Sequence, residues 1–345
     1  MEKKVFKLLL LTMILLLSSC SSPNVEKKEE KTNNPISTKE NTTSENDEKS
    51  SNENDSFDPI PVFDKTSTVD PQVLYDEKEM KIELKKMEYN DYSVEITMAF
   101  SNKSKTDLRV LSQSGAISKN TINGFMAEGG YINVDVEAGK TVEDIVEYSY
   151  DSLSIYGIDG IGELSFDFNI DAKDYTVDYK EFETGALVVK TSNFDKYQTK
   201  ETDFFDRITS KAIENKFEIK ILDKNKDNVF EQNGIAINSI VQMENKDSEK
   251  IVLLELNNTS KAEVGIYTND IKLDDKLISE GLWSYEGINP SKRSIMDISV
   301  SRLLEEEEWK KLNINEPKKL TFIIKAKNED GNDIIQPTEI NIDLK

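Results

Sequence analysis

From about residue 73 onwards, apolar and polar residues alternate with a period of two, which is the pattern of β-strands that bury one face. Residues 92–100 and 164–170 show it most clearly. The apolar positions in these two segments are Tyr92, Val94, Ile96, Met98 and Phe100, and Leu164, Phe166, Phe168 and Ile170. Shorter alternating segments cover residues 80–84, 132–136 and 187–189, with polar turn sequences between them. This spacing of short strands predicts an antiparallel β-sandwich.

The second half of the chain repeats the first at an offset of about 156 residues, since residues 95–110 align without gaps with residues 251–266. The alignment matches Asn102 with Asn258, Ser104 with Ser260 and Lys105 with Lys261, and farther on Leu164 with Leu320 and Phe166 with Phe322. The predicted fold class is therefore all-β, with two tandem sandwiches at residues 73–194 and 229–345. Each has a size suited to one hydrophobic core.

Residues 195–228 are predicted to connect the two sandwiches. Within them, residues 201–217 place several apolar side chains near one face of a helix, namely Phe205, Ile208, Ala212 and Phe217. We expect a short helix that packs against a neighbouring sandwich, with a partner-binding helix as the alternative.

The chain begins with the features of a secretory signal peptide. Lys3, Lys4 and Lys7 accompany the apolar run from Leu8 to Leu17. This run of about ten residues is shorter than the roughly 20 that a transmembrane helix needs. A signal peptide at residues 1–19 is therefore the better interpretation.

Residues 17–20 (LSSC) resemble the lipobox of bacterial lipoproteins. The resemblance implies that Cys20 carries diacylglycerol and becomes the first residue of the mature chain, on the extracytoplasmic face of the bacterial cell membrane. Two acyl chains are enough for stable anchoring. An ordinary signal peptide with an unpaired cysteine nearby is the alternative. Because residues 21–55 contain almost no apolar side chain, residues 20–72 are predicted to be a disordered tether.

Four stretches resemble the immunoglobulin-like repeats of surface lipoproteins from low-GC Gram-positive bacteria. They are a strand ending in SNKSK or NNTSK, a later AGK turn, the corner SLSIYGIDGIGELSFDF and a closing strand LVVKTS. The resemblance covers residues 75–192 and, more loosely, residues 229–345, where EEEEWKKLNINE replaces SIYGIDG and predicts a short helical turn. It implies two tandem immunoglobulin-like antiparallel β-sandwiches and an envelope location, and it supplies no catalytic residues.

Composition excludes several classes of function. The 345 residues include no histidine and one cysteine, which removes the usual general base, most catalytic triads and typical zinc or copper sites. The sequence also has no glycine-rich phosphate loop. The formal net charge of −22 argues against nucleic acid or an anionic polymer as a direct partner. We therefore expect a protein that is not an enzyme.

Asp223, Asn225 and Asp227 have the D-x-N-x-D spacing with which many calcium loops begin. A complete EF-hand loop also has Gly at its sixth position and Glu at its twelfth, where this chain has Asn228 and Gly234. The missing Glu removes the strongest ligand, so a polar connector is the main interpretation of this segment. Calcium remains the one cofactor that the sequence leaves open.

Together these features predict a lipid-anchored surface protein that recognises a protein partner or organises the envelope. Its expected partners are the membrane, through diacylglycerol on Cys20, and an envelope protein, whereas nucleic acid is not expected. A calcium-dependent adhesion or spacer module is the first alternative. A solute-binding lipoprotein of a transporter is the second, and it would require two α/β lobes around a cleft.

Overall fold

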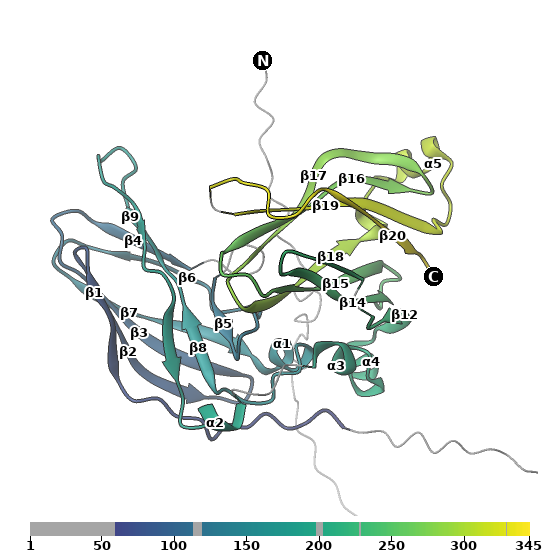
Figure 1. Cartoon of the computed structure of the whole chain (residues 1–345). Helices are drawn as coiled ribbons and strands as arrows, with labels where there is room; N and C mark the ends of the chain where they lie inside the picture. The colour runs from purple at the N-terminus through teal and green to yellow at the C-terminus, as the bar shows by residue number, and fades with distance from the viewer. Residues whose placement is uncertain (1–58, 113–118, 198–202, 228, 329) are drawn as a thin grey trace, which may run out of the picture. The chain divides into compact units, whose positions relative to one another are not determined.

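The computed structural model describes residues 59–112, 119–197, 203–227, 229–328 and 330–345. Strands dominate these residues and the helices are short, as the alternating sequence pattern predicted (Figure 1). The named strands form five sheets, and every pair of neighbouring strands within a sheet is antiparallel.

The first sandwich consists of β1 (Gln72–Glu77), β2 (Met80–Tyr89), β3 (Ser93–Asn102), β4 (Leu108–Ser112), β5 (Thr121–Ile122), β6 (Ile132–Val136), β7 (Thr141–Ser149), α1 (Tyr150–Ile155), β8 (Glu163–Phe166), β9 (Asn169–Ala172), β10 (Phe182–Glu183) and β11 (Leu187–Lys190). One layer has the order β1-β2-β3-β7, and the other contains β10-β9-β4-β6 and β11-β8-β5. Phe100 of β3 and Phe168, which follows β8, meet in the core with their ring centroids 5.3 Å apart.

The second sandwich consists of β12 (Lys220–Asn225), β13 (Phe230–Gln232), β14 (Ile235–Glu244), β15 (Lys250–Asn258), β16 (Val264–Leu273), β17 (Lys276–Ile288), β18 (Lys292–Ser299), η3 (Val300–Arg302), α5 (Glu306–Leu312), β19 (Lys319–Asn328) and β20 (Thr338–Asp343). Its layers are β12-β14-β15-β18 and β17-β16-β19-β20. One buried cluster joins both layers and includes Leu254, Met296, Ile266 and Phe322. The short helical turn predicted from EEEEWKKLNINE is confirmed as α5.

The two sandwiches share one strand order. The order β2-β3-β7 in the first corresponds to β14-β15-β18 in the second, and β9-β4-β6 corresponds to β19-β16-β17. The paired residues Leu164 and Leu320 are fully buried, as are Phe166 and Phe322. The predicted all-β fold with two tandem antiparallel sandwiches is therefore confirmed.

A buried asparagine closes the same turn in both sandwiches. The side-chain amides of Asn102 and Asn258 each donate to the carbonyl four residues ahead and to the carbonyl that ends β6 or β17, at 2.8 to 2.9 Å. Each side-chain carbonyl accepts from the N–H of Ser104 or Ser260 at 2.9 Å. Because these bonds satisfy backbone groups that the turn buries, the repeated SNKSK and NNTSK sequences are structural.

The connector contains α2 (Phe194–Tyr197), α3 (Phe204–Ile208) and α4 (Lys211–Phe217). The short helix expected within residues 201–217 is present as two helices, α3 and α4. Helix α3 ends at Ile208. Ser210 then caps the start of α4, where its Oγ accepts a hydrogen bond from Ile213 N at 3.3 Å. A serine that caps a helix interrupts the preceding one without disturbing the apolar periodicity, which is why the pattern alone suggested a single helix.

The second sandwich begins before the predicted end of the connector at residue 228. Strand β12 already begins at Lys220 and pairs with β14. As the edge strand of its sheet it carries mostly half-buried or exposed residues, so its sequence, KILDKN, lacks the strong alternation of a central strand.

Strand β15 is buried on both faces. Leu254 and Leu256 enter the core of the second sandwich, while Leu253 and Glu255 on the opposite face are also buried. The apolar side chains of α3 and α4 are also buried, among them Phe204 and Ile213. Glu214 of α4 accepts a hydrogen bond from Ile221 N of β12 at 2.7 Å. The connector helices thus contact the second sandwich at β12, and the expectation that the connector packs against a sandwich is confirmed.

Residues 59–71, which we name the arm, pack against the first sandwich and do not continue the tether predicted over residues 20–72. Ser67 is fully buried and donates to Ile161 O at 2.7 Å, while Asp64 N donates to Asp159 O at 2.7 Å. Backbone and hydroxyl hydrogen bonds hold the arm, and its sequence has no periodic apolar pattern that would predict packing. The rest of the predicted tether lies outside the described residues.

Candidate functional site

The two ends of β3 mark two ends of the first sandwich. The loop end consists of three turns, residues 103–107, 137–140 and 173–181, which hydrogen bonds join at Asp107. Asp107 O accepts from Lys173 N, and its Oδ1 accepts from the backbone of the middle turn, both at 2.9 Å. The base consists of the arm, α1 and α2. Figure 1 shows β9 and α2 toward opposite ends of the sandwich.

Asp64 fixes the arm at the base. Its Oδ2 accepts from Lys196 Nζ at 2.6 Å and from the Tyr197 hydroxyl at 2.8 Å, and its Oδ1 accepts from Thr66 N at 2.9 Å. The hydrogen bond with Lys196, followed by those with Thr66, lowers the pKa of Asp64 well below its ordinary value in spite of partial burial. The ionised carboxylate is thus the form that holds the arm.

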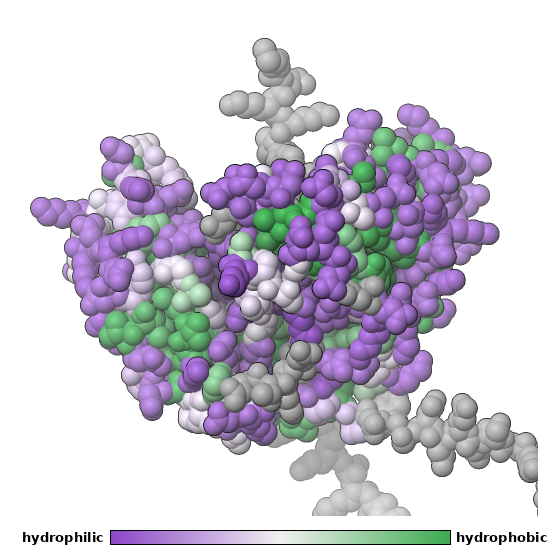
Figure 2. Space-filling model, in the orientation of Figure 1, coloured by the Kyte–Doolittle hydropathy of each residue, from purple (hydrophilic) through white to green (hydrophobic). Residues whose placement is uncertain are grey.

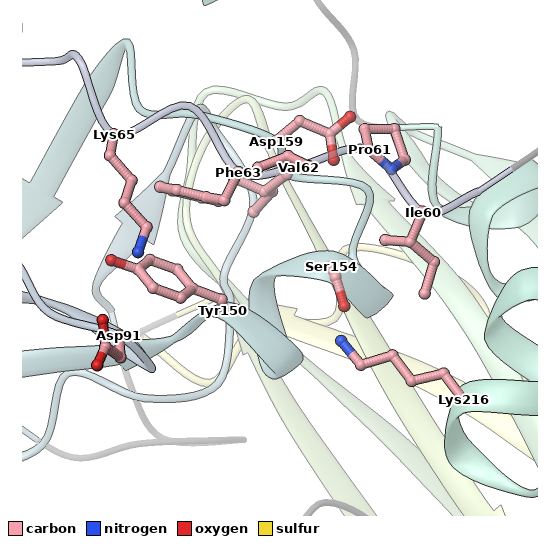
Figure 3. A pocket seen from close by; sticks show the side chains of 11 residues that line it. Ile60, Pro61, Val62, Phe63, Lys65, Asp91, Tyr150, Ser154, Asp159 and Lys216 are labelled. Atoms are coloured by element: carbon pink, nitrogen blue, oxygen red, sulfur yellow. The ribbon is translucent and has the colours of Figure 1, made fainter. Parts of the chain in front are cut away.

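A pocket of about 330 Å³ opens beside the arm at the base. It is lined by Ile60, Pro61, Val62, Phe63, Lys65, Asp91, Tyr150, Ser154, Ile158, Asp159 and Lys216. Figure 3 shows Lys65, Phe63 and Tyr150 on one side of it and Ser154 and Lys216 on the other. The rings of Phe63 and Tyr150 lie 4.8 Å apart, and Lys65 Nζ lies 4.6 Å from the Tyr150 ring centroid.

The polar side chains of Ser154, Lys216 and Asp159 bond to residues outside the pocket lining rather than to one another. Ser154 Oγ donates to Asp151 O at 2.8 Å, and Lys216 Nζ pairs with Asp151 Oδ1 at 2.6 Å. Asp159 pairs with both terminal nitrogens of Arg207, at 2.9 and 2.7 Å. Ser154 and Lys216 therefore do not form the hydrogen-bonded couple that a nucleophile and its base require.

The second sandwich docks on the first through a backbone contact. Met126 N donates to Arg293 O at 2.8 Å, and Arg293 N donates to Gly124 O at 3.1 Å, so residues 124–126 pair in parallel with the edge strand β18. Asn123 supports this segment, since its side-chain oxygen accepts from Gly162 N at 2.8 Å. We name the pairing of residues 124–126 with β18, together with the side chains that the two sandwiches pack around it, the joint. It covers an edge strand that would otherwise present unpaired backbone groups.

Aromatic packing accompanies the backbone pairing in the joint. Phe125 is fully buried, and its ring lies 5.0 Å from that of Tyr156 and 6.4 Å from that of Phe204. The guanidinium of Arg293 lies 5.5 Å from the Phe125 ring and donates to Glu255 Oε1 at 3.0 Å. A cation held over a buried ring next to its counter-ion stabilises both the ring position and the charge.

Ion pairs cross the joint as well. Lys119 of the first sandwich contacts Glu183 of the same sandwich at 2.8 Å and Glu263 of the second at 3.0 Å. Burial opposes the charge on Lys119, but the hydrogen bonds with Glu183 and Glu263 outweigh it and raise the lysine pKa. Asn289 of the second sandwich donates to Lys119 O at 3.1 Å. The loop end of the second sandwich, where Glu263 and Asn289 lie, is therefore a protein-contacting surface.

Buried carboxyl groups lie near the joint. Glu286 of β17 is 5% exposed and accepts a hydrogen bond from the Ser294 hydroxyl, and burial raises its pKa to about 8. Burial also raises the pKa of Asp297 on β18. The Tyr156 hydroxyl of the first sandwich has a raised pKa, first through burial and then through the nearby acidic residues, which include Glu286. At neutral pH Glu286 is mainly protonated.

The residues singled out in the sequence do not form a shared site. Cys20 lies outside the described residues. Asp223 and Asn225 belong to β12, and Asn225 Oδ1 accepts from Asp227 N at 2.8 Å in the turn that follows. Within the described part of the chain, no three Cys, Asp or Glu side chains gather as a metal site would require. The calcium hypothesis stays a prediction.

Sequence reasoning missed the joint, although two signals pointed to it. The run Ile251 to Leu254 is continuously apolar, which is typical of a strand buried on both faces. Asn123 and Gly124 both have positive φ, at 50° and 80°, as an Asn-Gly turn allows. Neither signal identifies the partner surface, because the contact joins residues 124–126 to Arg293, far apart in the sequence.

Comparisons with known proteins leave the family open. No family model and no curated protein matches the chain. Among solved structures, the crystal structure of red sea bream transglutaminase is similar at 11% identity and a TM-score of 0.17, over 78% of this chain and 32% of that chain. This chain therefore spans about a third of that protein's length, and so distant a similarity lends no support to an enzymatic activity. Along the described residues, no helix is long and apolar enough to cross a membrane.

Proposed function

We propose that this chain is a non-enzymatic, lipid-anchored protein on the extracytoplasmic face of a bacterial membrane, where it recognises a protein partner or organises the envelope. The observation that carries the proposal is the joint. There, the loop end of one sandwich makes a protein contact through Glu263, Asn289 and Arg293. A fold that already binds a protein surface with this end is suited to binding another with the equivalent end of its other copy.

The anchoring part of the proposal rests on the LSSC sequence that ends at Cys20. Replacing the cysteine in Cys20→Ser removes the atom to which diacylglycerol is attached. The variant is expected to accumulate as unprocessed precursor or as protein released from the membrane, measured by cell fractionation and by the mass of the N-terminal peptide. Membrane-bound protein that still carries a lipid after this change would contradict the proposal.

The recognition part is tested by cross-linking intact producing cells with a short amine-reactive reagent, followed by capture of the full chain and mass spectrometry. One protein partner that recurs in independent cultures, and that is absent when the captured chain is an unrelated lipoprotein with the same signal peptide, is expected. Recovery of wall polymer alone would contradict recognition and favour a spacer.

A further inference from the structure

The first sandwich has a free surface at the position where the second sandwich binds protein. At an offset of 156 residues, Glu263 of the second copy corresponds to Asp107 of the first. Asn289, the first residue after β17, has the same place in the fold as Glu137, the first residue after β6. Glu263 and Asn289 contact Lys119 in the joint. Asp107 and Glu137 are exposed, and neither forms an ion pair in the described part of the chain.

The same surface carries an ordered aromatic side chain. Tyr175, in the hairpin after β9, is 69% exposed, and its hydroxyl accepts from Arg109 Nη1 at 3.2 Å. Asp174 Oδ1 accepts from Thr176 N at 2.9 Å and from its hydroxyl at 2.7 Å, which fixes the turn. Val177, 43% exposed, lies two residues farther on. An exposed tyrosine that is already held in place loses little conformational entropy on binding, as the anchors of protein interfaces do.

The position of this surface suits contact with another molecule. It lies at the end of β3 opposite to the base, where Asp64 fixes the arm and where the chain arrives from its N-terminal part. Hydrophilic residues cover most of the face seen in Figure 2, and hydrophobic residues gather there in separate patches. A short apolar anchor within a charged surround is a common arrangement of a protein interface.

We infer that the loop end of the first sandwich is a docking surface for a protein that presents a basic side chain beside an apolar recess. The recess accepts Tyr175 and Val177, and the basic side chain pairs with Asp107 as Lys119 pairs with Glu263 in the joint. This inference rests on the proposed recognition function and names its surface. The net charge of −22 also favours approach by a basic partner.

The test places a photo-cross-linking residue at position 175 of the full chain in intact producing cells. The matched control carries it at position 92, since Tyr92 is 81% exposed in the turn between β2 and β3, at the base. A discrete protein adduct from position 175 and none from position 92 is expected. Val177→Asp and Asp107→Asn are each expected to reduce the adduct at least about ten-fold, a loss typical of interface anchors. Asp107→Asn keeps a side-chain oxygen that can accept the hydrogen bond from Ala138 N.

Three kinds of adduct at position 175 would overturn the inference. They are an adduct with the mass of two copies of this chain, a polymer ladder in place of a discrete protein, and an adduct that neither substitution weakens. A protein adduct that forms only at position 92 would refute this surface and leave the proposed recognition function standing. The absence of any protein adduct, at either position and at exposed positions of the second sandwich, would refute both. Unchanged thermal unfolding of each variant establishes that it is folded.

Discussion

The substitution of Glu286 tests whether the buried carboxyl group of the second sandwich is protonated at neutral pH. The substitution Glu286→Gln keeps the length of the side chain and an oxygen that can accept the Ser294 hydroxyl hydrogen bond. It removes the ability to ionise. Because the wild-type carboxyl group is 5% exposed and has a pKa of about 8, the substitution separates the effect of charge from that of packing.

The sign follows from the raised pKa. Between the ordinary glutamate value of 4.5 and about 8, the folded chain keeps a proton that the unfolded chain releases. The wild-type protein therefore loses stability as pH rises through this range, and no further loss from this group occurs above it. At pH 7 the difference of 2.5 units between pH and the unfolded pKa corresponds to about 3 kcal/mol, whereas at pH 4.5 and below the contribution is close to zero.

Urea unfolding of both proteins at pH 5 and pH 7.5 measures this difference. The free energy of unfolding of Glu286→Gln, taken relative to that of the wild type, is expected to be about 2 to 3 kcal/mol higher at pH 7.5 than at pH 5. Glu280→Gln, an exposed change on the same strand, serves as the control and is expected to show no such gain. A stability difference between Glu286→Gln and wild type that stays constant from pH 5 to 7.5 would refute the assignment of a protonated, buried Glu286.

Three further predictions concern other parts of the chain. Asn258→Ala removes side-chain bonds to buried carbonyls and should lower the free energy of unfolding by about 2 to 4 kcal/mol in urea, and a loss below about 1 kcal/mol would contradict the structural role of the turn. Asp64 has a lowered pKa, so its contribution is present above the ordinary value of 3.8 and is lost as pH falls below it. The melting temperature of Asp64→Asn should accordingly decrease less than that of the wild type between pH 5 and pH 3. An equal decrease in both proteins would contradict the role of the ionised Asp64 carboxylate. Calcium at millimolar concentration is expected to leave the melting temperature unchanged, because Asn225 already accepts a backbone hydrogen bond, and a rise that Asp223→Ala abolishes would instead support a calcium-dependent module.

The alternating pattern predicted the strands that face a single core. Val94, Ile96, Met98 and Phe100 are fully buried on β3, as the period of two required. Tyr92 continues the same pattern in the sequence but is 81% exposed, because it lies in the turn before β3 begins. Periodicity identifies the buried face of a strand, and the turn geometry decides where that face ends.

Features held by polar contacts were not predictable in the same way. The arm carries the fully buried Ser67, whose partner is a backbone carbonyl 94 residues away. The joint depends on Arg293, which pairs with Phe125 and Glu255 on two different segments. A single sequence shows which residues can form such bonds and gives no information about which distant segments supply the partners.

The Asp64 clamp has a consequence for how a pull on the arm would enter the first sandwich. A pull on the chain before residue 59 enters the first sandwich at the base, through hydrogen bonds of 2.6 and 2.8 Å to Lys196 and Tyr197. If a partner holds the loop end, the force runs along β3 from one end of the first sandwich to the other. Under the proposed anchoring, a pull would therefore load the first sandwich along the length of its strands, with the Asp64 clamp among the first contacts to bear it.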